Sequence, residues 1–222
     1  MVKQPSTEPL SDGSHIAFGI KETGPNQRHV VLVFKSAKLN GTAILHHAWH
    51  KCTRVDEWDA SYFTVGIRGL DPELQETFAD WAEDIVGRIE ETPIPYGVFY
   101  NLLANFNSET GYVDRDDHSG HTCATFLLDL FSSYKIPLLD LCTWPESRPG
   151  DAEWGAKIMG YLQNSTDVAQ DYLALQYAYF AKMRRFRPEE IAGGAILFVG
   201  EKLPFDKVAP LGEYVLHEMA GA

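Results

Sequence analysis

The chain has 222 residues, of which 45% are hydrophobic and 23% charged, and its formal net charge is −12. This length and composition are typical of a single globular domain, and the acidic balance argues against nucleic acid as a partner, because a phosphate backbone requires a basic surface. No apolar run approaches the roughly 20 residues of a membrane span, and the N-terminal residues lack the apolar core of a signal peptide. We therefore expect synthesis in the cytoplasm without a signal peptide, and no transmembrane segment.

The order of the predicted elements is strands first and helices afterwards. Residues 1–14 are polar and are expected to form a flexible tail before a single domain at 15–222. Short β-rich runs at 15–20, 29–34, 43–49 and 62–67 predict an antiparallel meander. Asp71 and Pro72 supply an N-cap and a first-turn proline for a helix to about Glu91. Strands followed by helices predict an α+β fold.

The second half of the chain is predicted to be mainly helical. Helices are expected at 151–162 and 167–186, and an apolar run after Gly193-Gly194 indicates a last strand at 195–199. Residues 136–141 form either a short strand or a loop. A short basic cluster near residue 186 is interpreted as a partner of the helix dipole at a helix end; its members are Arg184, Arg185 and Arg187.

Cys123 is the most informative residue of the chain. Thr122 is a suitable N-cap, and apolar residues recur at helical spacing after it, so the cysteine is expected in the first turn of an amphipathic helix. The helix dipole and unpaired backbone N–H groups favour thiolate over thiol at such a position. Cys52 and Cys142 lack this context and are expected to be structural. Three cysteines are also too few to indicate a disulfide scaffold.

Histidines are concentrated in the predicted meander. His29 begins one strand and shares a face with Val31 and Val33, whereas His46 and His47 of the next strand face opposite sides. In a hairpin, His29 would lie near His47 or His46 on one face of the sheet. A helix packed on that face by its N-terminus would then bring Cys123 against His29, giving a thiol, a base and a polar group that orients the base.

Two sequence blocks together resemble a known family. The segment RHVVLVF followed by NGTAILHHAWH, and TPIPYG followed by HTCATFLLDLF, are similar to the histidine and cysteine blocks of NlpC-type papain-like cysteine peptidases. The histidine block precedes the cysteine block here, which resembles the circularly permuted branch. The resemblance covers residues 28–131. It departs from the family pattern at Thr122, where Asp or Asn is usual, and at Val31, where glycine is usual.

The resemblance implies a fold, four catalytic residues and an activity. The fold would be papain-like, with an antiparallel sheet packed against helices and extra helices at the C-terminus. Cys123 matches the nucleophile, His29 the base, His47 the residue that orients the base, and Tyr96 the tyrosine beside the oxyanion site. His46 is an alternative for the orienting position. The reaction would be cleavage of an amide bond through an acyl-enzyme, without metal or cofactor.

The substrate implied by the family is an amide bond in a peptidoglycan stem peptide. Together with the missing signal peptide, this resembles antibacterial effectors that secretion systems deliver into a target cell's periplasm, with an immunity protein as a further partner. Two alternatives stay open: a lipid or protein acyltransferase or thioesterase with the same dyad, with the helix at 172–186 as one wall of an apolar groove, and a binding domain without catalysis.

Other site chemistries are weaker. Zinc would require three ligands such as His46, His50 and Cys52, at spacings that match no common zinc motif. A second such set consists of His118, His121 and Cys123. His217 would serve as the base if the family order were unpermuted, but it lies close to the C-terminus. The acidic set of Asp114, Asp116 and Asp117 falls in a polar loop.

Overall fold

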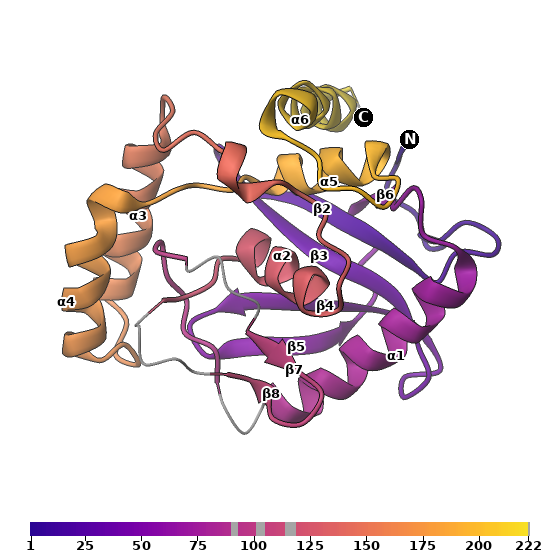
Figure 1. Ribbon diagram of the computed structural model, residues 1–222, viewed down its shortest axis with the longest axis horizontal. Coiled ribbons are helices and arrows are strands. Elements are labelled where there is room, and N and C mark those ends of the chain that lie inside the picture. Colours follow the sequence, from indigo (N-terminus) through magenta and orange to yellow (C-terminus); the bar gives the residue numbers. More distant parts are fainter. Residues whose placement is uncertain (90–92, 101–104, 114–118, 222) are drawn as a thin grey trace.

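A computed structural model describes residues 1–89, 93–100, 105–113 and 119–221. A six-stranded antiparallel sheet occupies its centre, in the order β1-β6-β2-β3-β4-β5 (Figure 1). The strands are β1 (Val2–Lys3), β2 (Ile16–Gly24), β3 (Gln27–Ser36), β4 (Gly41–Trp49), β5 (Cys52–Glu57) and β6 (Phe63–Gly66). The turns between consecutive strands from β2 to β5 contain three residues with positive φ angles: Asn26, Asn40 and Lys51. Asparagine tolerates this conformation better than most residues.

The first strand corrects the expected tail. Val2 and Lys3 pair with Val65 and Thr64 of β6, so the chain begins at an edge of the sheet. The segment that follows is also held in place. The indole N–H of Trp58 donates to the Ser6 carbonyl at 2.8 Å, and the hydroxyl of Thr64 donates to a further carbonyl of this segment at 3.2 Å.

Helices cover one face of the sheet (Figure 1). They are α1 (Pro72–Ile89), α2 (Cys123–Ser133) and α5 (Pro188–Leu197), with α6 (Phe205–Ala220) packed outside α5. Side chains from α1, α2 and α5 pack with Leu32, Phe34 and Leu45 of the strands in one large core. The general α+β class is therefore confirmed.

Two helices form a smaller unit beside the sheet (Figure 1). α3 (Asp151–Gln163) and α4 (Gln170–Tyr179) enclose a second apolar cluster that includes Tyr96, Tyr172 and Met183. The helix expected at 167–186 is shorter, because a 3-10 turn, Phe180–Lys182, follows α4. Short segments complete the described fold: another 3-10 turn, Leu141–Thr143, and the hairpin of β7 (Phe106–Asn107) and β8 (Gly111–Tyr112).

The C-terminal prediction was wrong in two respects. The apolar run expected as a strand at 195–199 instead forms the end of α5 and the residues after it, and α6 was not predicted. Gly193 and Gly194 lie inside α5, where Gly193 allows close contact with the backbone of α6: a Cβ there would approach the Gly212 nitrogen at 2.7 Å.

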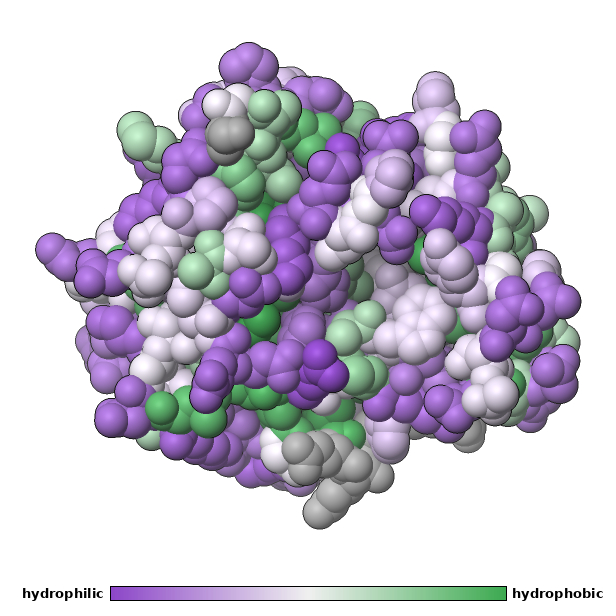
Figure 2. All heavy atoms as spheres, turned by 180° about the vertical axis from the view of Figure 1, so that it is seen from behind, coloured by the Kyte–Doolittle hydropathy of each residue, from purple (hydrophilic) through white to green (hydrophobic). Residues whose placement is uncertain are grey.

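Among the described residues, the opposite face of the sheet carries a small apolar cluster and no helix. Val31, Val33, Ile44 and Tyr62 are buried there, with Leu10 and Trp58 packed against them. From this side the molecule presents mainly polar residues with apolar ones between them (Figure 2). Alternation along β3 therefore decides which side each of its residues serves: Val30 and Leu32 face the helices, and Val31 and Val33 face away.

Candidate active site

Cys123 begins α2, as the sequence predicted. Thr122 is the N-cap: its hydroxyl accepts from the Thr125 N–H at 3.2 Å, and the Thr125 hydroxyl accepts from the Thr122 N–H at 2.8 Å. This reciprocal pair satisfies two N–H groups that the first turn of a helix leaves without partners. The helix start is fixed against the sheet, because Cys123 packs in the large core.

The thiol does not have the environment that its place on the helix suggested. Cys123 is buried, and burial raises the pKa of its thiol to about 11. The backbone N–H groups of Val30 and Ala124 and the Arg185 guanidinium act in the opposite direction, but they do not offset the loss of solvation. Burial of Cys123 therefore opposes the thiolate that its place at the start of α2 favours.

Tyr96 lies beside the start of α2 because two loops pair there. Tyr96 and His121 form a parallel bridge, with the His121 N–H donating to the Pro95 carbonyl at 2.9 Å. The Tyr172 hydroxyl of α4 donates to the Tyr96 carbonyl at 2.9 Å. Burial raises the pKa of the Tyr96 phenol, and the nearby Cys123 raises it further. The phenol is therefore a neutral hydrogen-bond donor.

His47 faces the helices and is fully buried. Its ring stacks on Tyr96 with centroids 5.5 Å apart and lies 5.9 Å from the ring of Phe126, one turn after Cys123 in α2. Nδ1 lies 2.8 Å from the Thr53 hydroxyl of β5, while Nε2 is buried with no hydrogen-bond partner among the described residues.

The electrostatics of His47 keep its imidazole neutral. Burial lowers the pKa of His47 well below the usual value, and the neighbouring His121, His29, His50 and His46 lower it further. With Nδ1–H donating to Thr53, the Nε2 lone pair remains available to accept a proton.

His29 is on the other side of the sheet from Cys123. It alternates with Val30 along β3, and Val30 packs in the same core as Cys123, whereas Val31 belongs to the opposite cluster. The structure therefore does not bring together the expected dyad of Cys123 and His29. The reason is that α2 covers the face of β3 that carries the even-numbered residues.

His29 instead pairs with His46, the alternative orienting residue. His29 Nε2 and His46 Nδ1 lie 2.8 Å apart, and His46 Nε2 lies 3.0 Å from Asp56 Oδ2. Desolvation lowers the pKa of His29 to about 3, with smaller contributions from His46, Lys21 and Arg54. This imidazole pair occupies the face without helices.

The remaining candidates lie apart from Cys123. His217 is on α6 with its side chain exposed, and Cys142 is exposed. Cys52 is half-buried in β5, where the Arg54 guanidinium lies 3.6 Å from its sulfur. Asp114, Asp116, Asp117 and His118 fall outside the described residues. Within the ranges that the structure describes, no group of three His, Cys, Asp or Glu residues is arranged to hold a metal.

Sequence reasoning missed two residues of this region. Thr53 lies in a strand that was not predicted, and β-branched polar residues such as threonine give no local signal of a role beside a histidine. Arg185 was interpreted as a helix-end residue, but it follows the 3-10 turn and pairs with Asp151 at the start of α3. Arg187, from the same cluster, is the N-cap of α5.

Comparisons with known proteins return no match. The chain fits no protein-family model, and none of the curated proteins or solved structures is significantly similar to it. In the described part of the chain, no helix is long and apolar enough to cross a membrane.

Proposed function

We propose that the chain is a cysteine-dependent hydrolase in which Cys123 attacks a carbonyl carbon and His47, not His29, takes the thiol proton. The observation that carries the proposal is the placement of His47. It shares the helix-covered face with Cys123, and its Nε2 is buried and has no partner among the described residues.

The strand register supports this pairing. Leu32 of β3 lies opposite Leu45 of β4. Continuing the antiparallel register by two residues brings Val30 level with His47. Because the Val30 backbone is close enough to Cys123 to lower the pKa of its thiol, we infer that the thiol and the imidazole lie near the same point of the sheet.

The proposed reaction begins from a neutral pair. As the sulfur bonds to the carbonyl carbon, its proton passes to His47 Nε2, and the Thr53 hydroxyl holds Nδ1–H in place. The resulting imidazolium returns the proton to the leaving amine or alcohol when the bond breaks. Water then cleaves the acyl-enzyme with His47 again as base. The Cys123 N–H at the start of α2 and the Tyr96 phenol are the donors proposed for the oxyanion.

The substrate class that we propose is an amide bond in a peptidoglycan stem peptide, as the family resemblance implies. Delivery into a target cell, with an immunity protein in the producer, remains part of the same proposal. One observation favours the alternative of a binding domain without catalysis: the raised pKa of the Cys123 thiol makes it a poor nucleophile at rest.

The test is acylation by an activated ester. Incubation with p-nitrophenyl acetate should add one acetyl group to Cys123, seen by mass spectrometry of the intact protein and its peptides. His47→Ala should lower the acylation rate by about 10²-fold or more, the range expected for loss of a general base. His29→Ala is the matched control, because it removes an imidazole from the other face of the sheet, and should leave the rate unchanged.

Each outcome has a defined meaning. Equal loss of acylation in both folded variants would contradict the role of His47. Absence of acylation at Cys123 in the unmodified chain would favour the binding domain. Digestion of purified muropeptides, followed by liquid chromatography and mass spectrometry, then tests the substrate class.

A further inference from the structure

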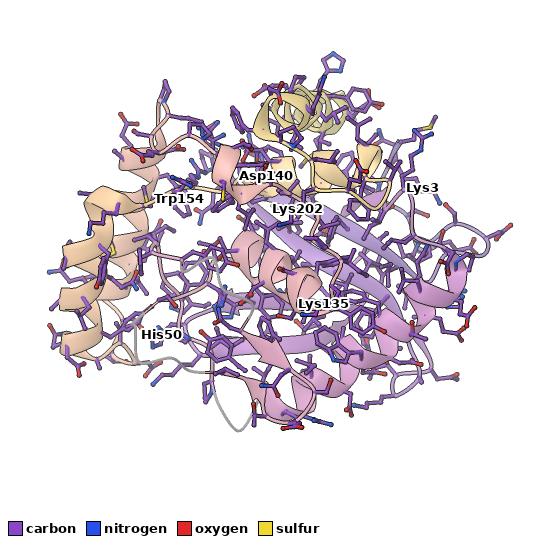
Figure 3. The ribbon with its side chains drawn as sticks, in the orientation of Figure 1. Lys3, His50, Lys135, Asp140, Trp154 and Lys202 are labelled. Atoms are coloured by element: carbon purple, nitrogen blue, oxygen red, sulfur yellow. The ribbon has the colours of Figure 1, made fainter. Side chains whose placement is uncertain are left out.

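A cavity of about 410 Å³ lies between the β2–β3 turn and the start of α3. Its lining includes Arg28, Arg185, Arg187 and Lys157, together with the indole of Trp154. Trp154 lies on the side of α3 nearest the sheet (Figure 3). A cavity with four cationic side chains is unexpected in a chain with a net charge of −12, and its volume suits a small ligand or a short peptide end.

Among the residues that the structure describes, the ion pairs at and behind the cavity wall leave one positive charge without a counterpart. Four guanidinium groups, those of Arg28, Arg148, Arg185 and Arg187, pair with three carboxylates, those of Asp151, Glu189 and Glu190. At the cavity wall, Lys157 and Glu153 of α3 offset each other. Buried charge without full compensation is costly, so an anion in the cavity would be stabilised.

We assign most of this uncompensated positive charge to the Arg185 guanidinium. Its side chain is only 11% exposed, and its nearest carboxylate oxygen, Oδ1 of Asp151, is 3.5 Å away. Its Nε is buried with no hydrogen-bond partner in the described chain. The guanidinium lies over the Trp154 ring at 4.4 Å from the centroid, which holds it in place. A guanidinium that is held rigidly and has unused donors is suited to bind a carboxylate.

Two residues of the cavity wall, Trp154 and Arg185, also interact with residues of the proposed reaction site. Arg28 lies two residues before Val30, whose backbone lowers the pKa of the Cys123 thiol. The Arg185 charge is close enough to lower the pKa values of both Cys123 and Tyr96. Trp154 packs against the apolar cluster that contains Tyr96.

We propose that this cavity is a substrate subsite that binds a carboxylate located close to the scissile bond, with Arg185 and Arg28 as its recognising residues. The proposal rests on the hydrolase function proposed above. It predicts a preference for peptides that end in a free carboxylate near the cleaved bond over peptides whose end is an amide.

The experiment measures binding separately from cleavage. Cys123→Ala, which cannot form an acyl-enzyme, is titrated by calorimetry with N-acetyl-alanyl-alanine, with its C-terminal amide, and with inorganic phosphate. We expect the acid to bind about tenfold or more tightly than the amide. If phosphate competes with the peptide acid, the cavity recognises anions in general. If phosphate does not compete, the cavity recognises a peptide carboxylate. Equal affinities for acid and amide, or binding of neither acid nor phosphate, would overturn the proposal.

Substitutions inside and outside the cavity test whether the carboxylate binds there. Adding Arg185→Gln to Cys123→Ala should remove the preference for the acid over the amide. Adding Lys157→Gln should weaken binding of the acid with little risk to the fold, because Lys157 is exposed. Arg68→Gln and Lys207→Gln, at exposed positions outside the cavity, are the matched charge controls and should change nothing. If Lys157→Gln and its control lower affinity equally, the cavity is not the binding site.

The two proposals fail in different ways. Binding of the acid without any acylation of unmodified Cys123 would retain the subsite and reject the hydrolase. Acylation and peptide cleavage without preference for the acid would retain the hydrolase and reject the subsite.

Discussion

At the scale of single residues, the chemistry of Cys123 depends on two opposing effects. The helix N-terminus and the neighbouring N–H groups favour the thiolate, and burial favours the thiol. Burial is the larger effect, because a buried anion loses its hydration while partial charges on the backbone restore only part of it. If Cys123 is the nucleophile that we propose, a base must take its proton when substrate is bound, because the thiol is not ionised beforehand.

Alkylation measures this balance directly. Because the pKa of the Cys123 thiol is about 11, its reaction with iodoacetamide should be slow at pH 8 and accelerate up to pH 10. The exposed Cys142 should be modified first at pH 8. Peptide mass spectrometry after timed quenching gives both rates. Fastest modification at Cys123 below pH 7 would instead indicate a preformed thiolate paired with a protonated histidine.

The imidazole pair of the half-buried His29 and the buried His46 predicts a pH dependence of stability. The pKa of His29 falls from 6.5 in the unfolded chain to about 3 in the folded one. Between these values the unfolded state binds the extra proton, so His29 destabilises the folded state progressively as the pH falls from about 6.5 towards 3. The slope is at most about 1.4 kcal/mol per pH unit for one proton.

His29→Gln should therefore make the loss of unfolding free energy between pH 6 and pH 4 shallower, as measured by urea titration at each pH. His217→Gln, which changes an exposed histidine on α6, is the control and should reproduce the original slope. An unchanged slope in His29→Gln would show that His29 is protonated in the folded protein.

Residue patterns predicted part of the candidate site. Thr122 as N-cap and Cys123 as the first helical residue follow from local spacing, and both are confirmed. Alternation also placed His29 with Val31 and Val33 on one face and separated His46 from His47. The sequence alone does not indicate which face of the sheet the helices cover, because both faces of β3 are apolar. The dyad was therefore assigned to the wrong side of the sheet.

At the scale of elements, the strands and early helices were predictable and the last helices were not. The four predicted strands and the helices at α1, α2 and α3 are present, because their periodicity and capping residues agree. β5 has the polar sequence CTRVDE of an edge strand, which lacks a regular apolar pattern. α5 is buried along most of its length, so its apolar run does not differ from that of a buried strand. Pro210 and Gly212 weaken the helical pattern of α6.

Two glycines in helices give opposite predictions. Gly193 lies where α5 meets α6, and a Cβ there would approach the Gly212 nitrogen at 2.7 Å and the Leu211 carbonyl carbon at 2.8 Å. Gly193→Ala should lower the free energy of unfolding by about 1–3 kcal/mol through overpacking. A Cβ at Gly160 of α3 would meet no atom within 4 Å. Gly160→Ala should raise the free energy of unfolding by about 0.5–1 kcal/mol, because alanine favours the helix.

Thermal unfolding followed by circular dichroism compares the two variants with the original chain. The midpoint should fall for Gly193→Ala and rise for Gly160→Ala. Similar shifts in both would mean that helix propensity alone, and not the contact between α5 and α6, determines the effect.

At the scale of the whole molecule, buried ion pairs join α3 to the segment that leads into α5. Asp151 is 4% exposed at its side chain and lies within 4 Å of Arg148, Arg185 and Arg187. Glu190 accepts from Arg148 and from the Trp144 indole. The network therefore links α3 to the segment that precedes it in the chain and to the segment that follows α4.

Removing the central carboxylate should destabilise the protein more than removing a surface one. Asp151→Asn leaves the four arginines of the network with two carboxylates, and we expect a loss of about 3–5 kcal/mol in the free energy of unfolding. Asp84→Asn breaks an exposed pair with Arg88 at 2.8 Å and should cost less than about 1 kcal/mol. Denaturant titrations measure both. Comparable losses would show that the Asp151 network is solvated.

The single layer of backbone between His46 and His47 has a consequence for how the two faces of the molecule respond to substitution. The side chains are sequence neighbours, yet one belongs to the imidazole pair and the other to the helix-covered site. Protonation of His46 can affect His47 only through its electrostatic field across the sheet or through a shift of β4. A substitution on one face of β4 can therefore change the environment of one histidine while that of the other is kept.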